Sequence, residues 1–381
     1  MVCYTGKNTN GKDRNMEFSG YLMSGEQPAA RIEKNCVEPL ERSRMPLYLA
    51  SGGDFEAWLV GRAIDRHRPN SRILKKVLRL TDSSDTAAVL RAHAATITDC
   101  FWVKRDDEPD LSYEQIRFRE DTFAEIALTG SFASYSRAYE LERAGGRSPE
   151  LTNIGSFEKC WRLEEGSWWL YKSGNPLERF SELFIAKLGK AMGFAMAEYL
   201  PDGQYVKTRD FTGGGLNFEP AEGLVGEEED YGFNYERLAA LRPELGRQYL
   251  DILYLDALCF NMDRHTQNYG ILRDQHTGEV LRMAPNFDNN IALISRGYGP
   301  DARQTNGLLM ELFLELLEEK GLTYESPALN EETVRVLAEN TLPDEDIDRT
   351  YVTEMVMERW QRMERRLHPT QEQAGQRFPA I

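Results

Sequence analysis

The chain has little of what builds disulfide frameworks, metal centres or membrane spans. It contains five cysteines and five histidines in 381 residues, without a CxxC or HExxH motif. An odd number of scattered cysteines argues against a disulfide framework and favours a reducing compartment, and zinc-ligand spacing is missing. The sequence has no apolar run of about 18 residues, and its first residues are polar, so we expect neither a membrane span nor a secretory signal. The expected location is cytoplasmic.

Positive charge is also scarce. The 46 Lys and Arg residues face 62 Asp and Glu residues, which gives a formal net charge of −16 and a pI near 5.0. This balance argues against direct binding to nucleic acid or to an anionic membrane surface. A hydrophobic content of 41% with 28% charged residues is typical of globular proteins. The length of 381 residues favours a chain with two lobes or with two to three domains.

Changes in composition divide the chain into three parts. Residues 143–151, RAGGRSPEL, collect Gly, Ser and Pro, and residues 212–232 combine a glycine run with acidic residues. Both stretches are typical of loops or junctions. We therefore expect an accessory region, mainly helical, over 1–145, a small lobe over 146–212 and a larger, mainly helical lobe over 213–381. The apolar burst that begins at Cys100 in the first part predicts a buried strand or loop.

The middle part predicts two hairpins on either side of one helix. Strands are expected at 159–163 and 167–172, joined by a Glu-Glu-Gly turn, and a second hairpin is expected within 196–211. Between them, Pro176 starts and Gly193 ends a stretch with apolar residues at three- and four-residue steps, which predicts a helix. This order of strands, helix and strands suits a small lobe that covers a nucleotide.

The last part predicts helices and a further hairpin. A helix over 243–260 should deliver the segment NMDRHTQN, residues 261–268, as a loop. A hairpin should follow, and its second strand leads into Asp288. Its strands are expected at 269–273 and 280–283, and later helices near 306–320, 331–340 and 347–367.

Three polar residues in the last part point to phosphoryl transfer. Asp263 and Asn268 lie five residues apart in one loop, and Asp288 follows the hairpin. A lone loop aspartate is usually a turn former, but this spacing also fits a base followed by metal ligands. We predict that Asp263 accepts a hydrogen bond from the attacking hydroxyl, and that Asn268 and Asp288 bind Mg²⁺ through hard oxygen atoms.

The neighbours of Asp263 have more than one interpretation. Arg264 positions the loop, meets a phosphate or forms a plain surface salt bridge, and the sequence does not decide among these. His265 is expected to be a structural hydrogen-bonding residue that fixes the loop.

Candidates for nucleotide binding lie in the middle part. Lys172 ends a predicted strand, where a lysine is usually a solvated edge residue. The following helix carries Glu178 and Glu182, and an ion pair with Glu182 would hold Lys172 against the ATP phosphates. Glu178, nearer the start of the helix, favours the helix dipole instead. The loop 152–159 could bring backbone N–H groups over phosphates.

Taken together, these motifs resemble HipA-like serine/threonine kinases, a bacterial group associated with toxin-antitoxin systems. The resemblance covers roughly residues 150–320 and rests on IGSFEK (154–159), WWLYKSG (168–174), the helix with Glu182, NMDRHTQN and PNFDNN. It implies an α+β, bilobal protein-kinase-like fold, with a small β-rich lobe and a mainly helical lobe. It also implies ATP and Mg²⁺ as cofactors, a Ser or Thr hydroxyl on a protein as substrate, and a small antitoxin as a candidate partner.

The resemblance assigns roles to further residues. Asp263 would be the base, Asn268 and Asp288 the Mg²⁺ ligands, and Lys172 a contact of ATP. The nucleotide-binding residues are then Gly155, Ser156, Phe157, Lys159, Lys172, Arg209, Asp210 and Phe211. Family members can silence themselves by phosphorylating a hydroxyl just before the nucleotide loop. The matching position is Thr152, with Ser156 nearby, although the family has serine where this chain has threonine.

Three other functions stay open. The segment DRH-x-x-N also resembles phosphoinositide lipid kinases, but those carry a DFG motif and a basic membrane-facing loop, whereas this chain has Asp288-Asn289-Asn290 and an acidic balance. A pseudokinase or antitoxin-bound regulatory module would bind the nucleotide without turnover. A metal-dependent hydrolase would use Asp263, Asn268 and Asp288 on a divalent ion without transfer to protein.

Overall fold

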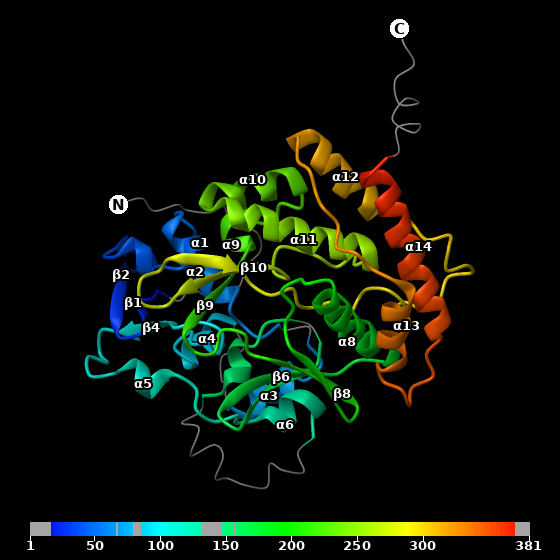
Figure 1. Cartoon of the computed structure of the whole chain (residues 1–381). Helices are drawn as coiled ribbons and strands as arrows, with labels where there is room; N and C mark the ends of the chain where they lie inside the picture. The colour runs from blue at the N-terminus through cyan, green and yellow to red at the C-terminus, as the bar shows by residue number, and fades with distance from the viewer. Residues whose placement is uncertain (1–16, 66–67, 79–84, 132–146, 156, 370–381) are drawn as a thin grey trace, which may run out of the picture. The chain divides into compact units, whose positions relative to one another are not determined.

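The chain divides into two compact units. The computed structural model describes residues 17–65, 68–78, 85–131, 147–155 and 157–369 (Figure 1). The first unit comprises 1–173, 207–224 and 271–281, and the second comprises 174–206, 225–270 and 282–381. The boundaries expected near residues 145 and 212 both fall inside the first unit, and the three-part division stays a prediction.

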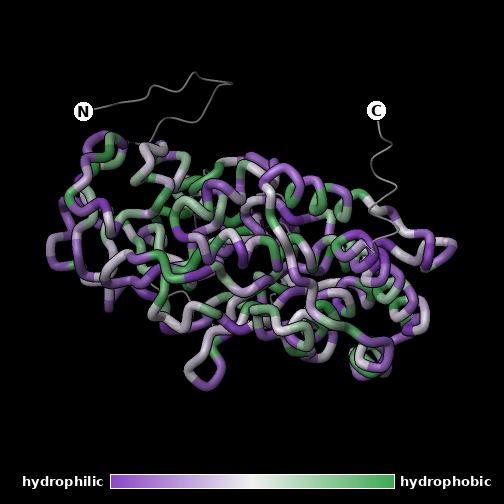
Figure 2. Tube along the Cα trace, turned by 45° about the horizontal axis from the view of Figure 1, so that its top comes forward, coloured by the Kyte–Doolittle hydropathy of each residue, from purple (hydrophilic) through white to green (hydrophobic). Residues whose placement is uncertain are grey.

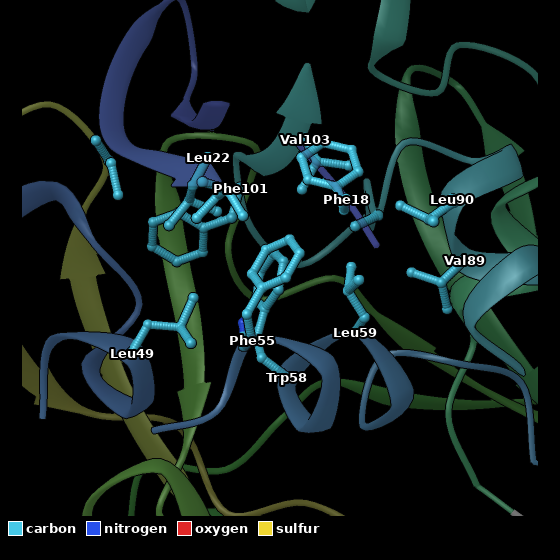
Figure 3. Close-up of a cluster of buried hydrophobic side chains, with 14 of the residues drawn as sticks. Phe18, Leu22, Leu49, Phe55, Trp58, Leu59, Val89, Leu90, Phe101 and Val103 are labelled. Atoms are coloured by element: carbon cyan, nitrogen blue, oxygen red, sulfur yellow. The ribbon is translucent and has the colours of Figure 1, made fainter. Parts of the chain in front are cut away.

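An antiparallel four-stranded sheet forms one side of the first unit's hydrophobic core. Its order is β3-β2-β1-β4, and its strands are β1 (Gly20–Ser24), β2 (Gln27–Glu33), β3 (Cys36–Pro39) and β4 (Phe101–Arg105). Leu22 and Phe101 from this sheet are buried together with Phe55 and Trp58 of helix α2 (Phe55–Val60), as Figure 3 shows. The stretch beginning at Cys100 is thus a buried strand, one of the two structures expected for it.

Short helices complete this region. They are α1 (Leu47–Ala50), α2, α3 (Ser71–Val77), α4 (Asp85–Arg91), α5 (Tyr113–Ile116) and α6 (Ala124–Thr129), with 3-10 turns at Arg42–Arg44 and Pro149–Thr152. Helices were expected here, but β1 to β3 were not. Gly20 and Pro28 lie in these strands, and both residue types have low strand propensity. The sheet is therefore specified by the packing of residues such as Leu22 and Ile32, which are fully buried.

The first hairpin of the middle part is confirmed. β5 (Lys159–Glu164) and β6 (Ser167–Lys172) form an antiparallel pair in which Lys159 faces Lys172. β8 (Tyr205–Arg209) is the next strand in the order, and β7 (Tyr199–Asp202) lies in the second unit. A three-stranded sheet of order β11-β10-β9 lies mainly in the first unit. Its strands are β9 (Leu216–Pro220), β10 (Gly270–Asp274) and β11 (Val280–Met283).

The second unit is built from the helices that the sequence predicted, with α10 added. They are α8 (Pro176–Ala191), α10 (Tyr231–Leu241), α11 (Pro243–Cys259), α12 (Leu308–Lys320), α13 (Glu331–Glu339) and α14 (Arg349–Leu367); the short α9 (Glu222–Val225) crosses the boundary between units. Helix α11 contacts α10, α12 and α14 (Figure 1). Asn175 and Glu178 form a capping box at the start of α8, so Glu178 serves the helix N-terminus.

Hydrophobic and hydrophilic segments alternate along the described chain (Figure 2). None of the helices in the described ranges is long and apolar enough to cross a membrane. Cys100, Cys160 and Cys259 are free and buried. Cys36 is disulfide-bonded, which the cysteine count had not led us to expect.

A buried arginine of α14 corrects a second expectation. Basic residues near the end of a helix usually favour its dipole and are solvated, which we expected of Arg359, but its side chain is fully buried. Its Nε donates to the carbonyls of Ala257 and Leu258 at 3.1 and 3.0 Å, and Nη1 donates to Thr305 Oγ1 at 2.9 Å and Asn306 O at 2.7 Å. Burial lowers its pKa to about 10, so it remains a cation at neutral pH. Arg359 therefore caps the carboxyl end of α11 from another helix.

Replacement of Arg359 by Met should be strongly destabilising. The change keeps the length of the side chain but leaves the buried carbonyls of Ala257 and Leu258 without their donor, which we expect to cost about 3 kcal/mol of unfolding free energy. Urea denaturation measures the loss. The matched control is Arg365→Met, because Arg365 is exposed and lies 3.6 Å from Glu358, where a loss below about 1 kcal/mol is expected. Equal losses would contradict the proposed capping role.

Candidate active site

The structure places the sequence-predicted residues in two groups, one in each unit. The second unit holds Glu182, Asp263, Asn268 and Asp288. The first unit holds Thr152, Gly155, Phe157, Lys159, Lys172, Arg209, Asp210 and Phe211. Ser156 lies outside the described residues. The expected pairing of Lys172 with Glu182 joins the two groups and stays a prediction.

Asp263 and Asn268 close a compact loop after α11. The Nδ2 atom of Asn268 donates to the carbonyl of Asp263 at 2.9 Å, and its backbone N–H donates to His265 O at 2.8 Å. At the start of the loop, the backbone N–H of Asp263 donates to Asn261 Oδ1 at 3.1 Å. His265 Nδ1 accepts from the backbone of Gln267 at 3.3 Å. His265 is thus a structural residue of the loop, as expected, and the five-residue spacing allows Asn268 to reach back to Asp263.

Arg264 ties this loop to the rest of the site. Its Nε and Nη2 atoms donate to the two carboxylate oxygens of Asp256 in α11 at 2.8 and 2.9 Å, and both side chains are only 2% exposed. Its Nη1 donates at 2.7 Å both to Asn268 O in the same loop and to Phe287 O in the segment around Asp288. Of the interpretations left open by the sequence, the surface salt bridge is excluded and the positioning of the loop is observed.

Asn289 connects three parts of the second unit. Its Oδ1 atom accepts from Arg264 Nη2 at 2.7 Å and from Asn261 Nδ2 at 3.3 Å. Its Nδ2 donates to Asn286 Oδ1 at 3.1 Å. Its backbone N–H donates to Glu182 Oε1 in α8 at 2.8 Å. Because Asn289 is the next residue after Asp288, these bonds hold the backbone beside the predicted metal ligand.

Asp288 itself adopts an uncommon backbone conformation. Its φ angle is +60°, in the left-handed region that Asp tolerates better than most residues. Its backbone N–H donates to Tyr199 Oη at 3.0 Å, and Asn286 two residues earlier forms a parallel bridge with Met196. Such conformations persist where the surroundings enforce them, and they are frequent at functional sites.

The carboxyl groups of Asp263 and Asp288 interact electrostatically. Burial raises the pKa of Asp263, and the negative charge of Asp288 raises it further, whereas His265, Arg264 and Arg296 act in the opposite direction. The net pKa of Asp263 lies above the usual aspartate value. The negative charge of Asp288 beside the carboxyl group of Asp263 makes a place where a cation or a proton is favoured.

The donor set fits a magnesium ion that arrives with a nucleotide. The hydrogen bond from Asn268 Nδ2 fixes the amide, and its Oδ1 atom has no hydrogen bond to any described residue. Within the described ranges no group of three or more His, Cys, Asp or Glu residues could hold a metal. Mg²⁺ is commonly held by one or two carboxylates together with substrate phosphates. Asn268 and Asp288 match that mode, in which the phosphates supply further ligands.

A cavity of about 410 Å³ opens beside Asp263. It lies within the second unit. Phe260, Met262 and Met355 line its apolar part, and Arg296 lies on its polar side with Asp263. Asp263 is therefore reachable by a molecule that enters this cavity.

In the first unit, Gly155 and two lysines form the nucleotide-loop group. Gly155 has φ +111°, a backbone conformation that residues with a side chain rarely adopt, and a Cβ there would have to displace the end of the Lys159 side chain. Lys159 faces Lys172 across β5 and β6, and Lys172 is 8% exposed. Like charges directly opposite on a sheet repel each other and are destabilising. An anion bound between the two ammonium groups would be attracted by both.

Arg68 anchors the backbone of the same loop. It is buried and donates to the carbonyl oxygens of Asn153 and Lys159. It also lies 3.5 Å from Glu150, whose pKa is raised by burial to about 7. The nucleotide-loop group therefore rests on a buried polar layer that sequence analysis did not identify.

Thr152 is not accessible in this structure. Its side chain is 5% exposed, and its Oγ1 donates to Ala95 O at 2.6 Å. Self-phosphorylation there stays a prediction, and it would require the segment to leave this position first.

The last three predicted nucleotide contacts lie at the end of β8. Arg209 Nη2 donates to Ser167 Oγ at 3.0 Å. The carboxylate of Asp210 accepts from the backbone and hydroxyl of Thr212, and burial raises the pKa of this aspartate. The rings of Phe211 and Phe218 meet edge to face, with centroids 5.4 Å apart. Arg209 and Phe211 thus lie on this segment. The carboxylate of Asp210 is hydrogen-bonded within the turn that follows it.

The sequence patterns assigned no role to Asp256, Asn261 or Asn289. The signal for Asp256 was present, because this carboxylate interrupts the run LYLDALC, residues 253–259, in which every side chain is buried. A buried carboxylate requires a partner, and the nearest unassigned cation along the chain is Arg264. No comparable signal marks the two asparagines.

The chain is similar to known proteins at the level of structure. No family model and no curated protein sequence matches the chain. The chain is similar to the Shewanella oneidensis MR-1 toxin-antitoxin protein HipA, solved with HipB and operator DNA, with a TM-score of 0.52 and 13% identity over 91% of this chain and 97% of that one. It is also similar to the Helicobacter pylori proinflammatory kinase CtkA, with a TM-score of 0.45 and 16% identity over 58% of this chain and 95% of that one. The chain therefore has a mixed helix and strand fold of the HipA type, as its sequence predicted.

Proposed function

We propose that this protein is a Mg-ATP-dependent kinase that phosphorylates a Ser or Thr hydroxyl on a protein. The observation that carries the proposal is the network around Arg264, which ties the Asp263 loop to the Asp288 segment. The network supports the proposal because it holds together the two segments that carry Asp263 and Asp288, to which we assign the base and a metal ligand. Phosphoryl transfer depends mainly on such positioning and on electrostatic stabilisation.

Each group has a defined role in this reaction. Asp263 accepts the proton of the acceptor hydroxyl while the hydroxyl oxygen bonds to the γ-phosphorus and the bond from phosphorus to the departing ADP oxygen breaks. Asn268 and Asp288 hold Mg²⁺, which supplies neutralisation of charge on the phosphate oxygens when it is bound. Lys159 and Lys172 contact the phosphates.

A small antitoxin partner is a second part of the proposal. It is supported by the similar fold of HipA, whose structure was solved with HipB and operator DNA. Co-purification of the chain with the product of a neighbouring gene tests this part independently of catalysis.

Transfer from γ-labelled ATP tests the main proposal. The full chain is incubated with Mg²⁺, labelled ATP and a mixed protein substrate, and label on Ser or Thr residues is the expected result. Release of labelled phosphate to water without labelled protein would indicate a hydrolase. Binding of ATP without turnover would indicate a pseudokinase. Either result overturns the proposal.

The pH dependence of transfer should reflect the buried position of Asp263. The base works only when deprotonated, and burial raises its pKa, so kcat/KM should fall on acidification at a pH above the ordinary aspartate pKa of about 3.9. The profile is measured with the fluorescence of the six tryptophans recorded at each pH, so that unfolding is separated from protonation. An acidic limb at or below the ordinary value, with the protein still folded, would rule out Asp263 as the titrating base.

A further inference from the structure

The cavity beside Asp263 contains a cation without a partner in the described part of the chain. Arg296 is exposed and lines the cavity, and no described residue forms an ion pair or hydrogen bond with its side chain. Its charge nevertheless reaches the base, because Arg296 lowers the pKa of Asp263. An anionic group of a molecule bound in the cavity would therefore lie near both residues.

The other carboxylate of the cavity is engaged by its own loop. Asp301 accepts from the backbone N–H of Arg303 at 2.9 Å and from Gln304 Nε2 at 2.9 Å. Asp263 is reserved for the acceptor hydroxyl by the proposed function. Neither carboxylate forms an ion pair or hydrogen bond with Arg296 in the described part of the chain, which favours an acidic group from outside the chain.

The apolar lining of the cavity indicates which groups a bound molecule has in addition to the anionic one. Phe260 and Met355 line the cavity, and Met262 at its wall is 53% exposed. An exposed apolar rim next to a cation fits a protein segment with mixed side chains better than a small polar metabolite.

We propose that this cavity binds the segment of the protein substrate that carries the acceptor hydroxyl, and that Arg296 selects segments with an acidic side chain beside that hydroxyl. The inference rests on the proposed kinase function and adds the class of acceptor to it. The acidic side chain lies against Arg296, and the apolar side chains of the segment lie against Met262 and Met355. Arg296 is thus a specificity-determining residue, separate from the base and the metal ligands.

Degenerate peptides with a central Ser or Thr and a single varied flanking position test the proposal. The full chain, Mg²⁺ and labelled ATP are used throughout, and Arg296→Glu is compared with the wild type. Arg303→Glu is the matched control, because Arg303 lies in the same segment and pairs with Glu354 at 3.6 Å, and its side chain does not line the cavity. The KM for ATP is measured in parallel.

The wild type should prefer Asp or Glu at one flanking position by about fivefold in kcat/KM, the size expected of a partly exposed ion pair. Arg296→Glu should turn this into a preference for Lys or Arg, and Arg303→Glu should leave it unchanged. A wild type without charge preference, or a preference that survives Arg296→Glu, overturns the inference. So does an effect of Arg296→Glu on the KM for ATP alone, which would place the nucleotide at this cation.

The failure of this inference is distinguishable from the failure of the kinase proposal. Transfer to whole proteins but to no peptide would leave the kinase standing and would overturn recognition through the acceptor segment. Absence of transfer to any protein or peptide overturns both.

Discussion

Replacement of Asp263 by Asn should reduce phosphoryl transfer by about 10²- to 10⁴-fold, the range expected for the loss of a general base. The amide has the size of the carboxyl group but cannot accept the proton of the acceptor hydroxyl. The backbone of residue 263 makes the hydrogen bonds that hold the loop, to Asn261 through its N–H and from Asn268 through its carbonyl. The substitution removes neither bond, so the loop should keep its conformation.

Stability should move in the opposite direction to activity in this variant. Because burial raises the pKa of Asp263, the ionised carboxylate is less favourable in the folded state than in the unfolded state. A neutral amide removes that cost, so Asp263→Asn should be as stable as the wild type or slightly more stable. An inactive variant with an undiminished unfolding free energy would separate a catalytic role from a folding defect.

The control is Asp344→Asn, which changes an exposed aspartate of the same unit. It should change neither transfer nor stability. Single-turnover transfer and urea denaturation are measured on the same preparations. Transfer by Asp263→Asn at more than a tenth of the wild-type rate would exclude Asp263 as the base.

The elements of the second unit were predictable because each has a local signal. Pro176 and Pro243 start α8 and α11, and apolar residues at three- and four-residue steps define the buried faces between the helix ends. The strands β1 and β2 lack such signals, since Gly20 and Pro28 lie in them, and their buried residues belong to a core cluster that includes Phe55. Local propensity predicts an element only where tertiary packing does not override it.

The candidate site likewise contains residues that the sequence predicted and residues that it did not. Asp263, Asn268 and Asp288 were found because their spacing and order match a known chemistry. Arg264 and Asn289, which hold these residues, were not assigned, because nothing in the order of residues shows that Asn289 lies next to Asn261 in space. Sequence thus predicts the groups that react, whereas the network that positions them emerges only from the fold.

Replacement of Arg264 by Met should have the largest effect on the folded state. Asp256 would remain in α11 as a carboxylate that is 2% exposed and has lost its partner, and breaking a buried ion pair in this way costs about 3 to 5 kcal/mol. The carbonyls of Asn268 and Phe287 also lose a donor at 2.7 Å. Urea denaturation should show a correspondingly lower unfolding free energy.

A more exposed arginine that also binds both oxygens of a carboxylate provides the control. Arg366 binds both carboxylate oxygens of Glu311 at 2.7 and 2.9 Å, but the two side chains are 38% and 48% exposed. Arg366→Met should cost less than about 1 kcal/mol, because solvent screens the pair. Similar losses at both arginines would show that burial does not set the strength of the Arg264 pair.

A double variant separates the energy of the pair from the positioning of the site. In Arg264→Met with Asp256→Leu, no buried charge is left without a partner, and such replacements of ion pairs by apolar residues are often close to neutral for stability. Most of the lost unfolding free energy should therefore return. Transfer should not return, because Asn289 and the carbonyl of Phe287 still lack the donor that links the Asp288 segment to the Asp263 loop. Recovery of both stability and transfer would mean that Arg264 only balances the charge of Asp256, and that the two loops hold their positions without it.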